Sequence, residues 1–210
     1  APDIEVVGEA MSGDEMLALL PTIEPDVVIL VNAPYANRSA PFVGPDATAT
    51  AVWATCQHSG QTQALNFFGW HRMYLYYYER VLRWAANDDT LRLPYWDYTD
   101  PAQLGMPAAF RDTTSTLYDA KRNPGINAGT VTLNQRATNV DRLLQNSTYF
   151  TYESRIEEGI HGYVHCTVGP TCPVAHMGDV PVAGNDPVFY AHHGNIDRLW
   201  ACWQQLHGTP

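Results

Sequence analysis

Basic side chains are scarce in this chain. Its 210 residues include 12 Lys and Arg against 22 Asp and Glu, so the formal net charge at pH 7 is −10. Nucleic acids and anionic membrane surfaces would repel a chain with this charge balance. The sequence also lacks an apolar run long enough to span a bilayer. We therefore expect neither a nucleic-acid partner nor a membrane partner.

Cysteine is also sparse, with four residues: Cys56, Cys166, Cys172 and Cys202. Cys166 and Cys172 bracket a short loop that contains Gly and Pro, which suits a disulfide; two free thiols are the alternative. A disulfide favours an oxidising compartment, so a secreted or extracytoplasmic location is one expectation. No repeat or low-complexity linker divides the sequence, and 45% of the residues are hydrophobic against 16% charged. Such a chain is globular, and we predict a single domain over residues 1–210.

Strand signals are few, and apolar residues recur mostly at helical intervals. The pattern predicts a short helix at 14–20 that ends before Pro21, and three long helices at about 66–86, 140–165 and 187–206. The segments between them, 21–55, 91–101 and 100–137, have the composition of irregular chain. The predicted fold class is mainly α: a bundle of about four helices with long loops and inward-facing side chains that can hold a metal.

Histidines supply the strongest local signal. Of eight in the chain, four fall in two tight sets. A lone histidine usually has a structural role, but His161 and His165 stand at i and i+4 in IEEGIHGYVH, which places both imidazoles on one helix face. This is the spacing that two ligands of one metal ion need. A third imidazole from a neighbouring helix would complete a three-nitrogen site with an open position.

The second set is His192 and His193, in NDPVFYAHHGNIDRLW. Neighbours on a helix diverge by about 100°, so only one member of the pair can point into the site. Asp197 and Trp200 lie at i+4 and i+7 from His193 and share its helix stripe. We therefore predict that His193 is the third ligand and that His192 packs or hydrogen-bonds beside it.

These motifs together resemble the type-3 copper proteins, which comprise tyrosinases, catechol oxidases (polyphenol oxidases) and molluscan-type hemocyanins. HGYVH resembles the segment with the first two copper-B ligands, and DPVFYAHHGNIDRLW resembles the segment whose second His is the third. FFGWHRMYLYYYERVL resembles the copper-A helix, and DDTLRLPYWDY looks like plant polyphenol oxidases. The resemblance covers roughly residues 53–205, with its motifs in the expected order.

The resemblance implies a copper-B ion held by His161, His165 and His193. It also implies that Glu157, four residues before His161, positions a water near copper B. Val180 falls where the family has a gate residue over the substrate entrance.

Charged residues near these motifs have a different expected role. Asp97 and Asp197 are expected to hydrogen-bond to imidazoles and orient them. Arg72, Glu79 and Arg198 are expected to form structural ion pairs within the bundle.

The match to copper A is incomplete. The family uses three histidines there, but only His58 and His71 are available, and no histidine precedes His58. Asn32 or Asn37 is left in the place of the first ligand, and an amide binds copper poorly. Some family members join the cysteine of a Cys-x-His motif covalently to the imidazole, which implies a thioether between Cys56 and His58. The alternative is a buried free cysteine beside an incidental histidine.

The resemblance implies a copper enzyme that oxidises o-diphenols to o-quinones with O2, so its partners are a phenolic small molecule and O2. Hydroxylation of monophenols is expected to be weak or absent, because Gly162 stands where strongly hydroxylating relatives have an Asn. One alternative is an oxygen-binding protein of the hemocyanin kind. Another is a single-metal protein with a non-oxidase, biosynthetic role, which the missing copper-A ligand favours. The oligomeric state cannot be predicted from these patterns.

Overall fold

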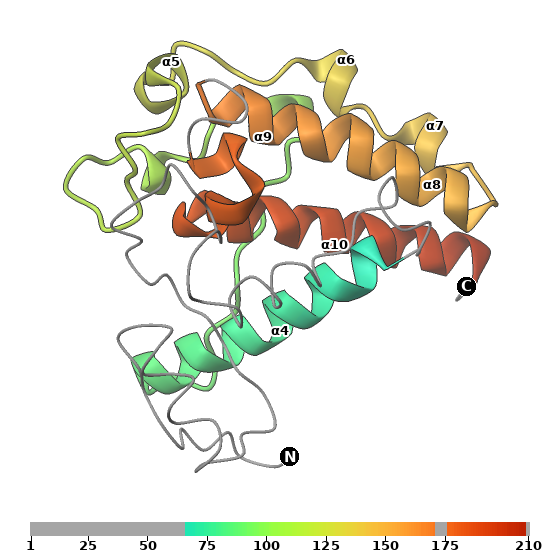
Figure 1. The fold of residues 1–210 in the computed structure, drawn as a ribbon, viewed down its shortest axis with the longest axis horizontal. Coiled ribbons are helices and arrows are strands. Elements are labelled where there is room, and N and C mark those ends of the chain that lie inside the picture. Colours follow the sequence, from blue (N-terminus) through green and yellow to red (C-terminus); the bar gives the residue numbers. More distant parts are fainter. Residues whose placement is uncertain (1–65, 171–175, 209–210) are drawn as a thin grey trace, which may run out of the picture. The chain divides into compact units, whose positions relative to one another are not determined.

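The structure is a computed structural model that describes residues 66–170 and 176–208 (Figure 1). All regular structure in these two ranges is helical, which confirms the predicted mainly α class. The chain divides into two compact units, each described by itself. The described residues of the first are 76–91, and those of the second are 66–75 and 92–208. The predicted single domain stays a prediction, and the predicted helix at 14–20 lies outside the described residues.

In the first unit, the end of helix α4 (Phe67–Ala86) is fixed by backbone hydrogen bonds. Asn87 adopts a left-handed conformation with φ of 49°, which Asn tolerates better than most residues. Its N–H donates to the carbonyl of Trp84 at 3.1 Å, and the N–H of Asp88 donates to Arg83 at 3.0 Å. Arg83 also pairs with Glu79 one turn earlier, as expected for a structural ion pair.

The second unit contains the start of α4 and a series of mostly short helical segments. In chain order these are η1 (Pro101–Gln103), η2 (Ala108–Phe110), α5 (Pro124–Ala128), α6 (Gln135–Thr138), α7 (Asp141–Leu144), α8 (Tyr149–Arg155), η3 (Ile156–His161), α9 (Gly162–Val168), η4 (His176–Gly178), η5 (Val180–Asn185) and α10 (Val188–His207). The long last helix was predicted within one or two residues. None of the described helices is long and apolar enough to cross a membrane.

The predicted helix over 140–165 is corrected to a broken one. α7 ends at Leu144 in a turn in which the N–H of Asn146 donates to Leu143 at 3.1 Å, and residues 146–148 are not helical. Asn146 and Ser147 favour such turns because their side chains compete for backbone hydrogen bonds. The chain then continues through α8, the π-helical segment η3 and α9, which run beside α10 (Figure 1).

Stacked aromatic rings join the helices around the site. Phe68, in the first turn of α4, stacks on Trp200 of α10 at 5.2 Å and on Tyr152 of α8 at 5.5 Å between ring centroids. Tyr152 in turn stacks on Trp203 at 5.3 Å. Because these large rings are buried, they fix the spacing of α4, α8 and α10 beside the histidines.

A buried ion pair holds the segment between η2 and α5 against the start of α10. The guanidinium of Arg122 donates to both carboxylate oxygens of Asp186, at 2.7 and 2.8 Å, and both side chains are almost fully buried. Arg122 also donates to the backbone carbonyl of Leu117, while Asp186 accepts from the N–H of Val188 at the start of α10. We call this pair the Arg122–Asp186 clamp.

Candidate metal centre

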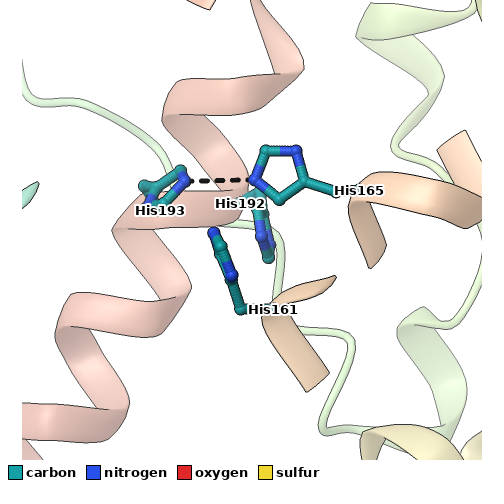
Figure 2. A group of neighbouring side chains, drawn as sticks. All are labelled: His161, His165, His192 and His193. Carbon is teal, nitrogen blue, oxygen red and sulfur yellow. Dashed lines mark hydrogen bonds between the residues drawn. The ribbon is translucent and has the colours of Figure 1, made fainter. Parts of the chain in front are cut away.

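Four buried imidazoles meet between the η3–α9 run and α10 (Figure 2). They belong to His161, His165, His192 and His193, and one ring nitrogen from each lies within 4.8 Å of the others. The first two come from consecutive turns of one helical run, as their i,i+4 spacing predicted, and their ring centroids are 4.5 Å apart. The structure therefore brings together the three predicted copper-B ligands and adds a fourth imidazole.

Backbone carbonyls orient the first two rings. Nδ1 of His161 lies 3.0 Å from the carbonyl oxygen of Glu157, and Nδ1 of His165 lies 2.6 Å from that of Met177. A carbonyl can only accept, so in both rings Nδ1 is the protonated nitrogen and donates. The other nitrogen, Nε2, then carries a lone pair that can bind a metal ion.

The π-helical turn explains how the carbonyl of Glu157 can serve His161. In η3 this carbonyl accepts the N–H of Gly162, five residues on, instead of that of His161. The wider turn brings the ring of His161 onto the same oxygen. Turns of this kind occur often at functional sites.

Close backbone packing brings Met177 to His165. A Cβ added to Gly169, just after α9, would lie 2.4 Å from the backbone nitrogen of Gly178 in η4. Only a glycine permits this approach, and it places the carbonyl of Met177 beside the His165 ring.

His193 faces His165 from α10. Their Nε2 atoms are 3.3 Å apart, the contact drawn in Figure 2. An ion bound at about 2.0–2.1 Å from each of two imidazoles in tetrahedral geometry separates the nitrogens by about 3.3 Å. Nδ1 of His193 is buried without a hydrogen-bond partner. The residues present therefore fit a metal ion with imidazole ligands.

His192 was predicted to pack or hydrogen-bond beside the site, and it does both. Its Nδ1 lies 2.9 Å from the hydroxyl of Tyr98, and its ring lies nearly parallel to that of His161, with centroids 5.4 Å apart. The segment with Tyr98 is held to α10 by the N–H of Trp96, which donates to Ala191 at 3.0 Å. Nε2 of His192 is buried without a partner, so this ring offers a further nitrogen to the cluster. The prediction that only one member of the His192–His193 pair can point into the site is therefore wrong.

Burial keeps three of the four imidazoles neutral. Loss of hydration lowers the pKa of His161, His192 and His193 well below the ordinary value, and the neighbouring imidazoles lower it further. Metal ions bind neutral imidazole, so these ligands need not lose protons at neutral pH.

His71 is the predicted copper-A histidine that the structure describes. It lies in α4, with Nδ1 2.7 Å from the carbonyl of Phe67, so its Nε2 is also free of a proton. Its ring stacks on that of His193, with centroids 4.4 Å apart and planes 4° apart. The other predicted copper-A features, His58 and the link from Cys56, lie outside the described residues, as do Asn32 and Asn37.

The prediction that Asp97 and Asp197 hydrogen-bond to imidazoles is wrong. Asp197 accepts from Nε of Arg72 at 2.5 Å, and Asp97 accepts from Arg198 at 2.6 Å and from Thr99. A carboxylate on the half-buried side of α10 gains more from a guanidinium than from a neutral ring. The predicted structural roles of Arg72 and Arg198 are confirmed. The groups that orient the imidazoles are instead three backbone carbonyls and the phenol of Tyr98.

Glu157 is buried on the turn before His161, as its predicted role near the metal requires. Val180 begins η5, but its side chain is outside the described set.

Cys166 is disulfide-bonded, while Cys172 lies outside the described residues. Tyr98 and Met177 were missed by the sequence analysis, because Tyr98 resembles any other core aromatic and Met177 acts through its backbone carbonyl.

A buried imidazole cluster between helices defines a metal-binding helical protein. A family model described as the common central domain of tyrosinase matches residues 31–131 and 106–206. The chain therefore belongs to the tyrosinase family, which confirms the resemblance.

Individual relatives agree with this assignment. The chain is 33% identical over 177 residues to "Polyphenol oxidase latent form, chloroplastic" of Prunus armeniaca, and 31% identical over 178 residues to "Aureusidin synthase" of Antirrhinum majus. These matches cover 68% of the chain but only 30% and 32% of the relatives. A solved structure of polyphenol oxidase from Grenache (Vitis vinifera) matches with a TM-score of 0.59 and 29% identity, over 69% of this chain and 52% of that one.

Proposed function

We propose that the chain is the copper-binding part of a polyphenol oxidase-like enzyme that oxidises o-diphenols to o-quinones with O2. The observation that carries this proposal is the buried cluster of four histidines, in which one ring nitrogen of each lies within 4.8 Å of the others. Soft imidazole donors suit copper better than they suit calcium or magnesium. The names of the relatives, which include "Catechol oxidase B, chloroplastic" of Solanum tuberosum, support the substrate class.

His161, His165 and His193 would hold the copper-B ion, and His71 would contribute to copper A. Bound copper supplies the redox chemistry by which electrons pass from the diphenol to O2. Two diphenols give up four electrons and four protons in all, and one O2 takes them to become two waters. The buried surroundings of the cluster limit access of bulk water to the reacting groups.

Protons leave the substrate through groups that this chain supplies. A phenol has a pKa of about 10, so it needs a base at neutral pH. We assign that role to Glu157, acting through a water beside copper B. Gly162 offers no side chain to help hold this water. We therefore expect diphenols to be preferred over monophenols, because a diphenol is oxidised more readily. Val180 remains the proposed gate residue.

A single-metal protein with a non-oxidase role is the second candidate. It is favoured by one observation: among the described residues, four imidazoles gather at copper B, whereas His71 alone represents copper A. Hemocyanin-like oxygen binding is a third reading, and turnover of a diphenol excludes it. For location we propose a compartment outside the cytosol, which the disulfide at Cys166 and the "chloroplastic" relatives support.

Copper analysis combined with a turnover assay tests the proposal. Purified protein is loaded with excess copper, desalted, and assayed with 4-methylcatechol while O2 uptake is followed. We expect close to one tightly bound copper and sub-stoichiometric copper at the second site, with quinone formation. Copper bound without quinone formation would favour the single-metal reading, and failure to bind copper would overturn both.

A further inference from the structure

A buried carboxylate outside the histidine cluster has no role in the function proposed so far. Glu153 lies on α8, two turns before His161, and its side chain is 0% exposed. Its Oε1 accepts from the backbone N–H of Phe67 at 2.9 Å and from the hydroxyl of Tyr149 at 3.3 Å. Its Oε2 is buried without a hydrogen-bond partner. A buried carboxylate oxygen without a hydrogen-bond partner destabilises the folded state, which indicates that Glu153 has a specific role.

The first contact places Glu153 at the start of α4. The first turn of a helix has free N–H groups and the positive end of the helix dipole, both of which favour a negative charge. The first turn of α4 contains no acidic residue of its own. Glu153 therefore supplies the charge from a helix 86 residues further along the chain.

Phe67, which donates a hydrogen bond to Glu153, also accepts one from the candidate metal ligand His71. Phe67 receives Glu153 at its N–H, and its carbonyl accepts from Nδ1 of His71 at 2.7 Å. The fully buried ring of Phe67 packs against His71 at 4.6 Å and against His161 at 4.8 Å between centroids. A shift of Phe67 would therefore move the ring of His71 and disturb the wall of the copper-B cluster.

We propose that Glu153 is a positioning residue whose carboxylate anchors Phe67 and thereby fixes the tautomer and placement of His71. The inference concerns the copper-A side of the site and rests on the proposed function only for what His71 binds. The anchor is strongest when the carboxylate is ionised, because a charged acceptor roughly doubles the strength of such a hydrogen bond.

The surroundings of Glu153 make this anchor sensitive to pH. Burial, partly offset by the N–H of Phe67 and the hydroxyl of Tyr149, raises the pKa of Glu153 to about 7. The titratable neighbours that act on it are Tyr149 and Glu157, and α4 faces it with the N–H groups of Phe67 and Phe68. The anchor should therefore strengthen as pH rises through neutrality.

The test follows the Phe67 amide by NMR in the full chain labelled with 15N-phenylalanine, without metal. We expect this amide to titrate with a midpoint near that of Glu153 and to lose the titration in Glu153→Gln. Glu158→Gln is the matched control, because it removes one negative charge from the exposed neighbour in the same helical run. A Phe67 amide that does not titrate, or that titrates equally in Glu153→Gln, would overturn the proposal.

A second readout addresses His71 and remains interpretable if Glu153→Gln folds poorly. In Tyr149→Phe the carboxylate and its bond to Phe67 are kept, so the Phe67 titration should persist with a shifted midpoint. Two-bond 1H–15N spectra should show the Nδ1–H tautomer of His71 in the unchanged protein, and a mixture of tautomers in Glu153→Gln at pH 8. Copper affinity at the second site should fall about fivefold in Glu153→Gln at pH 8 and little at pH 6. If no copper binds there at all, the proposed function fails, while the two NMR results still decide the role of Glu153.

Discussion

The two adjacent histidines of α10 differ in what their nitrogens already contact. Nδ1 of His192 is engaged by Tyr98, whereas Nε2 of His193 faces Nε2 of His165 at 3.3 Å. We predict that His193→Ala loses most of the copper-B ion, with affinity falling at least about 100-fold. His192→Ala should keep most of it. Competition with a copper chelator measures both values, and equal losses would remove the basis for choosing His193.

At the position after His161, the missing side chain can be restored. A Cβ at Gly162 would meet nothing nearer than the carbonyl oxygen of Glu157 at 3.6 Å, which is an ordinary contact. We predict that Gly162→Asn folds normally and raises the rate on tyramine relative to dopamine several-fold, because the amide can help Glu157 hold a water. Initial rates on both substrates measure this ratio. An unchanged ratio, with equal copper loading, would contradict the role given to this position.

The clustering of His161, His165 and His193 was predictable because i,i+4 spacing and an adjacent pair are visible along the chain. Their hydrogen-bond partners were not. Met177 acts through its carbonyl, which every residue possesses, and Glu153 reaches Phe67 across 86 residues. The prediction for Asp97 and Asp197 was wrong because the sequence shows a carboxylate near a ligand, but not the arginine with which that carboxylate pairs in the fold.

At the scale of elements, the approach of η4 to the end of α9 depends on one glycine. Gly169→Ala would place a Cβ 2.4 Å from the nitrogen and 2.7 Å from the Cα of Gly178, so the two backbones must separate. The carbonyl of Met177 would then move away from His165. We predict a loss of roughly 1–3 kcal/mol in the free energy of unfolding and a weaker copper-B site.

Denaturant unfolding and chelator competition check this expectation. Gly69→Ala is the matched control, because a Cβ at this exposed helical position meets nothing within 4 Å. Equal behaviour of the two variants would show that the contact between α9 and η4 does not position His165.

Element boundaries show where sequence patterns stop being informative. The apolar spacing of α10 is regular, and its bounds were predicted closely. The π-helical segment η3 escaped prediction, because a single wide turn changes the register without changing which residues are apolar. The short helices between η1 and α7 were missed for another reason. Each is only a turn or so long, and several begin at an Asn or Asp side chain that also fits a loop.

At the scale of the whole molecule, the buried histidines make the stability of the metal-free protein depend on pH. Their pKa values are lowered in the folded state, so the unfolded chain binds more protons below about pH 6.5. Stability is therefore present above that value and is lost as pH falls. Glu153 acts in the opposite sense, since its raised pKa removes stability as pH rises towards 7. Burial also raises the pKa values of Asp179 and Asp186, which act in the same sense as Glu153. The pKa values of the three histidines are lowered far enough for them to dominate between pH 7 and pH 5.

We thus predict that the thermal midpoint of the metal-free protein drops steeply between pH 7 and pH 5, and that bound copper flattens this dependence near neutrality. Differential scanning calorimetry across this range, with and without copper, measures both effects. A midpoint that is constant from pH 7 to pH 5 without metal would show that these imidazoles are not held neutral.

The Arg122–Asp186 clamp also has a consequence for the kinetics of folding. Its partners are separated by 64 residues, so a large loop must close before their hydrogen bonds can form. Such contacts usually form after the rate-limiting step. Replacing both partners with neutral side chains, Arg122→Met with Asp186→Asn, should then accelerate unfolding while leaving refolding almost unchanged. Stopped-flow measurements over a denaturant series separate the two rates, and slower refolding would place the clamp in the folding nucleus. On this view the clamp determines how long the assembled histidine site persists, and contributes little to how fast it forms.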